Sequence, residues 1–203
     1  MQRTEKLKKL SQSRGAKEAS ALIKKLGIKS CTELEFRDLI AEMKDSVCHF
    51  EVYRCLAQMP ITLRLLLTVC LRGHLAVAKS IYKHLSNVCY FPRECLENAC
   101  VSGNIALVEW AAEQLETPYC PWYHVFRSGN MSLLRWAQKR YPGCLANHAA
   151  LRYALHGGSI QMCEWIVRAG RIKSIDSHAW QAARSSKNPK VWVWAKEKFS
   201  VHS

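Results

Sequence analysis

Cysteine and histidine are the residue types in this sequence whose spacing comes closest to a chemical site. Three groups of neighbours invite a zinc interpretation: Cys48-His49 with Cys55, Cys89 with Cys95 and Cys100, and Cys120 with His124. Structural zinc sites take their ligands from tight pairs, such as two cysteines with two to four residues between them. None of the three groups combines two such pairs of ligands, so we expect no metal and no cofactor. We interpret the cysteines as reduced thiols, several of them in the core.

The sequence also contains no recognisable catalytic pattern. His124 and His156 would serve as general bases only beside a nucleophile or a metal, and the sequence identifies neither. No G-x-S-x-G, P-loop, G-x-G-x-x-G or H-E-x-x-H pattern occurs. We therefore predict that the protein is not an enzyme, and an unrecognised enzyme is the third of three hypotheses.

The charge is strongly positive and unevenly distributed. The chain of 203 residues has 30 Lys and Arg against 16 Asp and Glu, which gives a formal net charge of +14. Residues 1–30 hold nine of the basic residues and two acidic ones. This distribution suits an acidic protein, a nucleic acid or an anionic membrane, and it also suits a merely solvated surface. The candidate phosphate contacts in this segment are Lys6, Lys8, Lys9, Arg14, Lys24 and Lys25.

Five segments repeat one pattern, and this repetition decides the predicted fold. They are RGHLAVAKSI (72–81), SGNIALVEWA (102–111), SGNMSLLRWA (128–137), GGSIQMCEWI (157–166) and SKNPKVWVWA (186–195). Their third residues, taken as anchors, are His74, Asn104, Asn130, Ser159 and Asn188, at intervals of 30, 26, 29 and 29 residues. Gly precedes four of the anchors, apolar residues follow three and four positions later, and Trp follows six positions later in four of the five.

Apolar residues also lie eight and five positions before each anchor. Offsets of three and four belong to one face of an α-helix, so each unit is predicted to be a helix, a glycine-containing break and a second helix. Asn, Ser or His at the anchor suits the start of the second helix. Prolines at 92, 118, 121 and 142 separate the units, and no stretch alternates with the period of a strand. The predicted class is all-α.

The order of these residues resembles the ankyrin repeat. The segment AxxxGNxxLV at 99–108 fits that family's pattern, and pieces such as GNIALVEWA and CPW resemble the Trp-rich ankyrin variants of large DNA viruses and some protists. The resemblance covers about residues 63–199. The Thr-Pro-Leu-His opening is absent and the units are shorter than 33 residues. The resemblance therefore implies a solenoid of stacked helix-turn-helix repeats with reduced or absent β-hairpin fingers.

Three segments are expected along the chain. Residues 1–33 form a basic N-terminal segment, residues 34–62 a degenerate first repeat or N-terminal cap, and residues 63–203 about five repeats, of which the last acts as the C-terminal cap. No apolar run is long enough to cross a membrane, and no apolar stretch follows the basic start as in a secretory signal. We expect an intracellular protein, in the cytoplasm or nucleus, of a host cell if the protein is viral.

The predicted binding surface is the outward face of the first helices, which lines the binding groove in ankyrin arrays. The candidate partner-binding residues on this face are Arg72, Asn98, Tyr123, His124, Arg127, Arg152, Tyr153 and His156. The tryptophans are predicted to pack between neighbouring repeats, and a base-stacking platform is the less favoured interpretation. The favoured function is a protein-binding module or adaptor whose partner has an acidic or mixed surface. The alternative is a nucleic-acid-associated protein that contacts phosphates through residues 3–29, a hypothesis that depends on charge alone.

Overall fold

The computed structural model describes residues 61–87 and 89–199. The chain divides into two compact units, residues 1–95 and 96–203, and each unit is described by itself. All regular elements in the described part are helices and none is a strand, which confirms the predicted all-α class. The predicted basic segment 1–33, nearly all of the predicted cap 34–62 and the six candidate phosphate contacts lie outside the described residues.

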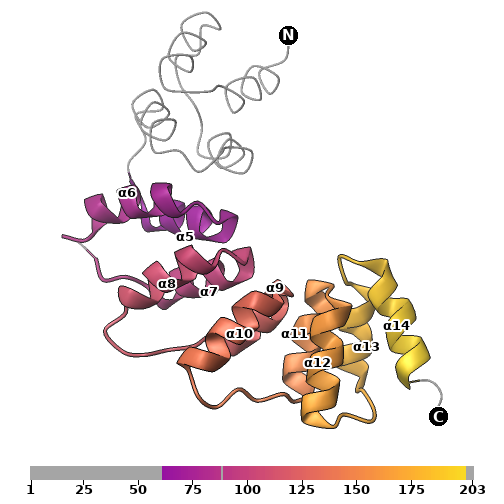
Figure 1. Cartoon of the computed structure of the whole chain (residues 1–203). Coiled ribbons are helices and arrows are strands. Elements are labelled where there is room, and N and C mark those ends of the chain that lie inside the picture. The colour runs from indigo at the N-terminus through magenta and orange to yellow at the C-terminus, as the bar shows by residue number, and fades with distance from the viewer. Residues whose placement is uncertain (1–60, 88, 200–203) are drawn as a thin grey trace, which may run out of the picture. The chain divides into compact units, whose positions relative to one another are not determined.

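The described helices come in five consecutive pairs (Figure 1). The pairs are α5 (Leu63–Arg72) with α6 (Leu75–Leu85), α7 (Arg93–Ser102) with α8 (Ile105–Glu113), α9 (Trp122–Ser128) with α10 (Met131–Arg140), α11 (His148–Gly157) with α12 (Ile160–Gly170), and α13 (Ser177–Arg184) with α14 (Pro189–Phe199). Each of the five predicted units thus contains a first helix, a short break and a second helix. The boundary between the two compact units falls inside α7.

The break between the helices of a pair has a simple local cause. Gly129 ends α9 in the left-handed conformation, with φ of 68°, and its N–H bonds to the carbonyl oxygen of Phe126. A Cβ on Gly129 would lie 2.6 Å from the Cβ of Ser159, so a larger residue there would be both strained and crowded. The anchor then starts the next helix. The Oδ1 atom of Asn130 accepts hydrogen bonds from the N–H groups of Ser132 and Leu133.

Three anchors have a second role that links one helix pair to the pair before it. The side chain of Asn130 donates to the carbonyl oxygen of Gly103 over 2.9 Å. Ser159 donates to Gly129 over 3.3 Å, and Asn188 donates to Gly158 over 3.0 Å. Each of these side chains therefore caps its own helix and also satisfies a carbonyl at the preceding break. We call this series of three hydrogen bonds the anchor ladder.

The core follows the repeat pattern, and the tryptophans lie at its border. The residues three and seven positions after the anchors are fully buried, as at Leu133 and Ala137 of α10. The tryptophans six positions after the anchors are only half-buried, so they border the core and do not fill it. They nevertheless contact neighbouring pairs: the indole N–H of Trp136 donates to Glu109 of α8 over 2.9 Å, and the Trp165 ring lies 6.4 Å from that of Phe126 in α9.

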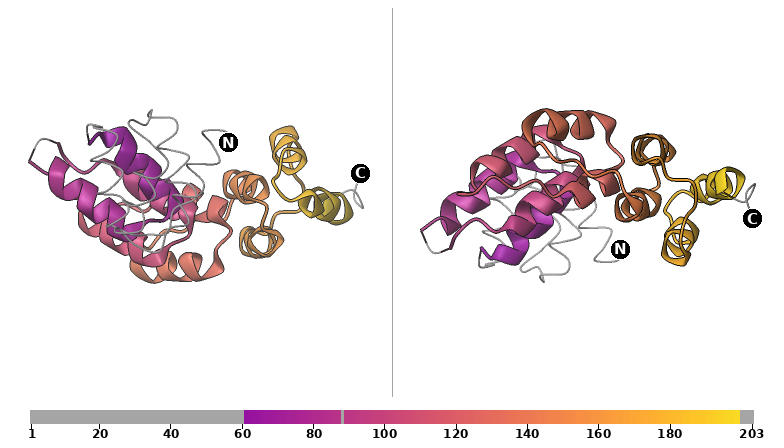
Figure 2. Two further views of the ribbon diagram at one scale, coloured as in Figure 1. Left: turned by 90° about the horizontal axis from the view of Figure 1, so that it is seen from above. Right: turned by 90° about the horizontal axis from the view of Figure 1, so that it is seen from below.

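Within the C-terminal unit, α11 contacts α9 on one side and α13 on the other. Helices α11 to α14 are seen nearly end-on in both views of Figure 2, so they run alongside one another. The approach of α9 to α11 is close: a Cβ on Gly157 would overlap the carbonyl oxygen of Arg127. None of the described helices is both long and apolar enough to cross a bilayer.

Candidate binding site

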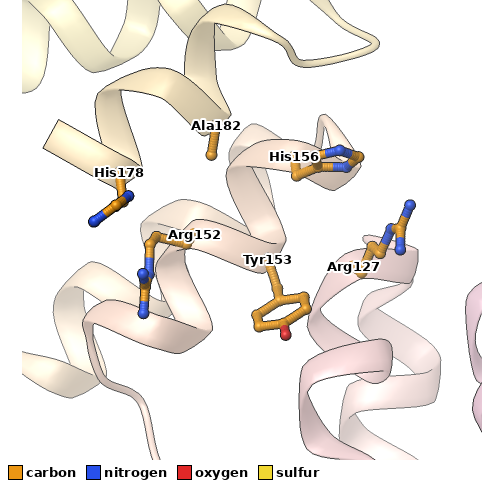
Figure 3. Close-up of a pocket in the computed structure, with 6 residues that line it drawn as sticks. All are labelled: Arg127, Arg152, Tyr153, His156, His178 and Ala182. Carbon is orange, nitrogen blue, oxygen red and sulfur yellow. The ribbon is translucent and has the colours of Figure 1, made fainter.

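One pocket of the C-terminal unit opens between three successive first helices (Figure 3). Its volume is about 340 Å³. The lining residues are Arg127 of α9, Arg152, Tyr153 and His156 of α11, and His178 and Ala182 of α13. We call it the cationic pocket. Four of the eight candidate partner-binding residues meet there, so the predicted outward face forms one continuous surface in this part of the chain.

The helical period explains why these side chains point away from the core. On α11, the side chains of Leu151, Ala154 and Leu155 are fully buried. Arg152, Tyr153 and His156 fall on the opposite side of the same helix, because successive residues are about 100° apart around its axis. In Figure 3, Tyr153 and His156 lie between Arg127 on one side and Arg152 and His178 on the other.

The lining of the cationic pocket contains two guanidinium and two imidazole groups and no carboxylate. The Nε atom of Arg152 and the Nδ1 atom of His156 are buried and have no hydrogen-bond partner in the described structure. Buried polar atoms are nearly always hydrogen-bonded in folded proteins, so these two atoms beside the pocket lack the partner that is usual for such atoms. The complementary ligand is an anion with acceptor oxygens, since Arg binds carboxylates and phosphates through paired hydrogen bonds.

A pair of stacked tyrosines borders the cationic pocket. The rings of Tyr123 on α9 and Tyr153 on α11 have centroids 4.9 Å apart and planes within 19° of parallel. Their exposed fractions are 42% and 38%, so each ring presents an edge or face to solvent. Exposed tyrosines beside arginines are typical of the residues that dominate binding energy in protein interfaces.

His124 lies beside the acidic Glu97 of α7, with 3.8 Å between its Nε2 atom and the carboxylate. The other carboxylate oxygen of Glu97 accepts a hydrogen bond of 3.1 Å from the Tyr119 hydroxyl. Burial lowers the pKa of His124, the Glu97 carboxylate opposes this shift, and the positive charge of Arg127 adds to it. His124 is therefore held mainly in its neutral form near neutral pH.

A second, smaller hollow of about 210 Å³ lies at the start of α9. Its walls come from the segment that enters α9 and from the loop after α10, and they are mainly aromatic or apolar. The lining residues are Tyr119, Cys120, Pro121, Trp122, Tyr123, His124, Gly143 and Leu145. We call it the aromatic hollow. Leu145, with 67% of its surface exposed, stands in the connecting loop and offers apolar area to solvent.

The remaining candidates have different surroundings. Arg72 is the exposed last residue of α5 and belongs to the N-terminal unit. Asn98 is half-buried in α7 and already interacts within the protein. His178 belongs to the cationic pocket although it is not among the residues predicted from the sequence. The sequence nevertheless contains the spacing from which this position could be predicted. His178 lies four residues before Ala182, and residues four apart share one face of a helix.

The described cysteines are free thiols. Burial raises the pKa of Cys163 to about 12, with a smaller contribution from Glu164, and it also raises the pKa of Cys120 to about 12, where Cys144 contributes. These thiols stay protonated at neutral pH and are poor nucleophiles. Within residues 61–87 and 89–199, no three His, Cys, Asp or Glu side chains gather as metal ligands would.

Comparison of the sequence with known proteins does not assign it to a family. No family model matches the sequence, and no curated protein matches it. The chemistry of the cationic pocket and of the aromatic hollow is therefore the basis for any functional conclusion.

Proposed function

We propose that this chain is an ankyrin-like solenoid that binds an acidic segment of another protein on the outward face of α9, α11 and α13. The single observation that carries the proposal is the cationic pocket, whose lining includes Arg127, Arg152, His156 and His178 and no carboxylate. An acidic side chain in this pocket would lie among cationic side chains with no carboxylate in the lining to repel it, and Arg binds carboxylates through charge-assisted hydrogen bonds.

Two features support the solenoid. The three first helices α9, α11 and α13 are in sequential contact, as expected when each repeat packs on its neighbours in the chain. Within the C-terminal unit, the anchor ladder joins the breaks at Gly129, Gly158 and Asn188 each to the break before it by equivalent hydrogen bonds. The loops between the pairs of the C-terminal unit contain no strand, which agrees with reduced fingers.

The proposal is tested by affinity capture with the full chain, followed by mass spectrometry, with and without nuclease. We expect acidic proteins to be captured in the presence of nuclease and to be lost with Arg152→Glu, because charge reversal places a carboxylate in the pocket. The matched control is Arg135→Glu, which reverses an exposed charge on α10 outside the pocket. Equal losses with both variants, or captured proteins without acidic character, would refute the proposal.

A second candidate function is nucleic-acid association. Its predicted contacts in residues 3–29 lie outside the described residues. The described part contributes one relevant observation, a hollow of about 640 Å³ at the C-terminal ends of α12 and α14. It is lined by Arg168, Arg171, Lys173 and Lys198 together with three apolar residues.

Salt dependence separates the two functions. Phosphate binding releases counterions, so nucleic-acid affinity should fall linearly on a log–log plot against salt and should drop when residues 1–30 are deleted. Protein binding through the cationic pocket should survive that deletion and weaken only moderately with salt. We expect the second pattern. DNA or RNA binding that persists without residues 1–30 and is lost with Arg127→Glu and Arg152→Glu would make the pocket a nucleic-acid surface.

A further inference from the structure

The cationic pocket and the aromatic hollow border the same pair of rings. Tyr153 lines the cationic pocket and Tyr123 lines the aromatic hollow. Because the two rings stack with centroids 4.9 Å apart, they form a wall with one hollow on each side. A ligand that crosses this wall would reach both hollows at once.

The two hollows differ in the chemistry that they accept. The cationic pocket has two arginines and two histidines in its lining. The aromatic hollow has no lysine, arginine or carboxylate, and its walls include Pro121, Trp122 and Leu145. Its one imidazole belongs to His124, whose pKa is lowered by burial and which lies 3.8 Å from the Glu97 carboxylate. The first hollow therefore suits an anionic group, and the second suits an aliphatic or aromatic side chain.

We propose that the ligand is an extended peptide segment that places an acidic side chain in the cationic pocket and an apolar side chain in the aromatic hollow, with its backbone crossing the Tyr123–Tyr153 wall. This inference rests on the proposed function and adds a second determinant to it. Neighbouring packed helices lie about 8–10 Å apart. An extended chain advances about 3.3 Å per residue and its side chains alternate between two faces, so two side chains that enter hollows on one surface should be separated by an even number of positions, two or four.

Charge and composition favour a peptide over a nucleic-acid strand. A strand presents a phosphate at every nucleotide and needs cations along its whole path. The aromatic hollow provides none. Affinity from an anionic contact combined with a buried apolar side chain is instead typical of short peptide motifs, in which one contact gives orientation and the other gives burial.

The test is selection of a phage-displayed library of random 12-residue peptides on the immobilised full chain. We expect enriched peptides to share an Asp or Glu and an apolar residue at one fixed spacing of two or four positions. The dissociation constants of synthetic copies are then measured by fluorescence anisotropy. Replacing either shared residue by Ser in the peptide should weaken binding at least about tenfold.

Matched variants assign each peptide residue to its hollow. Leu145→Glu should abolish the preference for the apolar residue, whereas Val193→Glu, at an exposed apolar position on α14, should not. Arg152→Glu should abolish the preference for the acidic residue, whereas Arg135→Glu should not. Because Arg152 is partly buried, the exposed His178→Glu repeats the test on a side chain whose change should not affect folding.

The outcomes distinguish this inference from the proposed function. Peptides that share only an acidic residue, or equal effects of Leu145→Glu and Val193→Glu, overturn the two-hollow ligand and leave the acidic-segment proposal standing. Enrichment without acidic residues, or no enrichment, overturns both. Retention of the fixed acidic–apolar spacing, with each preference lost in its own variant, supports both.

Discussion

Asn130 joins two helix pairs: its side-chain Nδ2 atom donates a hydrogen bond of 2.9 Å to the carbonyl oxygen of Gly103, 27 residues earlier in the chain. The Oδ1 atom of the same side chain caps α10. One amide group thus stabilises a helix start and a contact between successive pairs. The same arrangement at Ser159 and Asn188 makes this relationship a property of the repeat.

The first prediction concerns this double role. Asn130→Ala removes a helix cap, worth about 1 kcal/mol, and an inter-pair hydrogen bond, worth about another 1 kcal/mol. We expect the free energy of unfolding, measured by urea titration, to fall by about the sum of these two contributions. Asn130→Ser should lose less, because serine performs both roles at Ser159. Equal losses for the alanine and serine variants would contradict the double role.

The second prediction uses the close approach of α9 and α11. Alanine is a better helix former than glycine by about 1 kcal/mol, so Gly157→Ala near the end of α11 would stabilise the protein if space were available. A Cβ at this position would instead overlap the carbonyl oxygen of Arg127. We expect a net destabilisation of about 1–3 kcal/mol. Thermal melts that show a higher Tm for Gly157→Ala would refute the close contact.

The third prediction compares two residues of α10. Leu133 is fully buried, so Leu133→Ala should lower the free energy of unfolding by about 2–5 kcal/mol. Trp136 is half-buried and bonded to Glu109, so Trp136→Ala should cost less, about 1–2 kcal/mol. Denaturant titration of both variants provides the comparison. A tryptophan variant that loses more stability than the leucine variant would place the indole in the core.

The fourth prediction concerns pH. Because burial lowers the pKa of His124 in the folded protein, the unfolded chain binds a proton more readily. The contribution of neutral His124 to the free energy of unfolding is fully present above about pH 6.5, the ordinary pKa of histidine. This contribution is lost as the pH falls below that value toward the lower pKa of the folded state. His124→Gln should therefore flatten the fall of Tm between neutral pH and pH 5. A fall as steep as in the wild type would show that His124 is not responsible.

The helical period is enough to predict the outward face. Apolar residues at fixed offsets identify the buried side of each helix, so the amino-acid sequence alone assigns Arg127, Arg152, Tyr153 and His156 to the opposite side. His178 is not included in that prediction, because the repeat pattern begins only eight residues before the anchor. Helix α13 begins about one turn before that point, at Ser177. Its position follows from the same period once the start of the helix is known.

The sequence is less informative about the tryptophans and the anchors. The position six residues after the anchor is rotated by about 100° around the helix axis from the centre of the buried face. A large ring at this position therefore lies at the edge of the core. Recurrence of Trp indicates packing without indicating its depth. The bond from Asn130 to Gly103 depends on how successive pairs pack, and no single-helix rule predicts it.

The anchor ladder also bears on how such a chain can change in length. Each anchor needs only a carbonyl at the preceding break, and the loops between the pairs take no part in the bond. Anchor intervals of 26 and 29 residues are therefore compatible with one and the same linkage. A tandem duplication of any stretch that contains one glycine–anchor step would bring its own connection with it. The array can thus evolve by gaining or losing whole units, while insertions accumulate in the loops at little cost to the linkage.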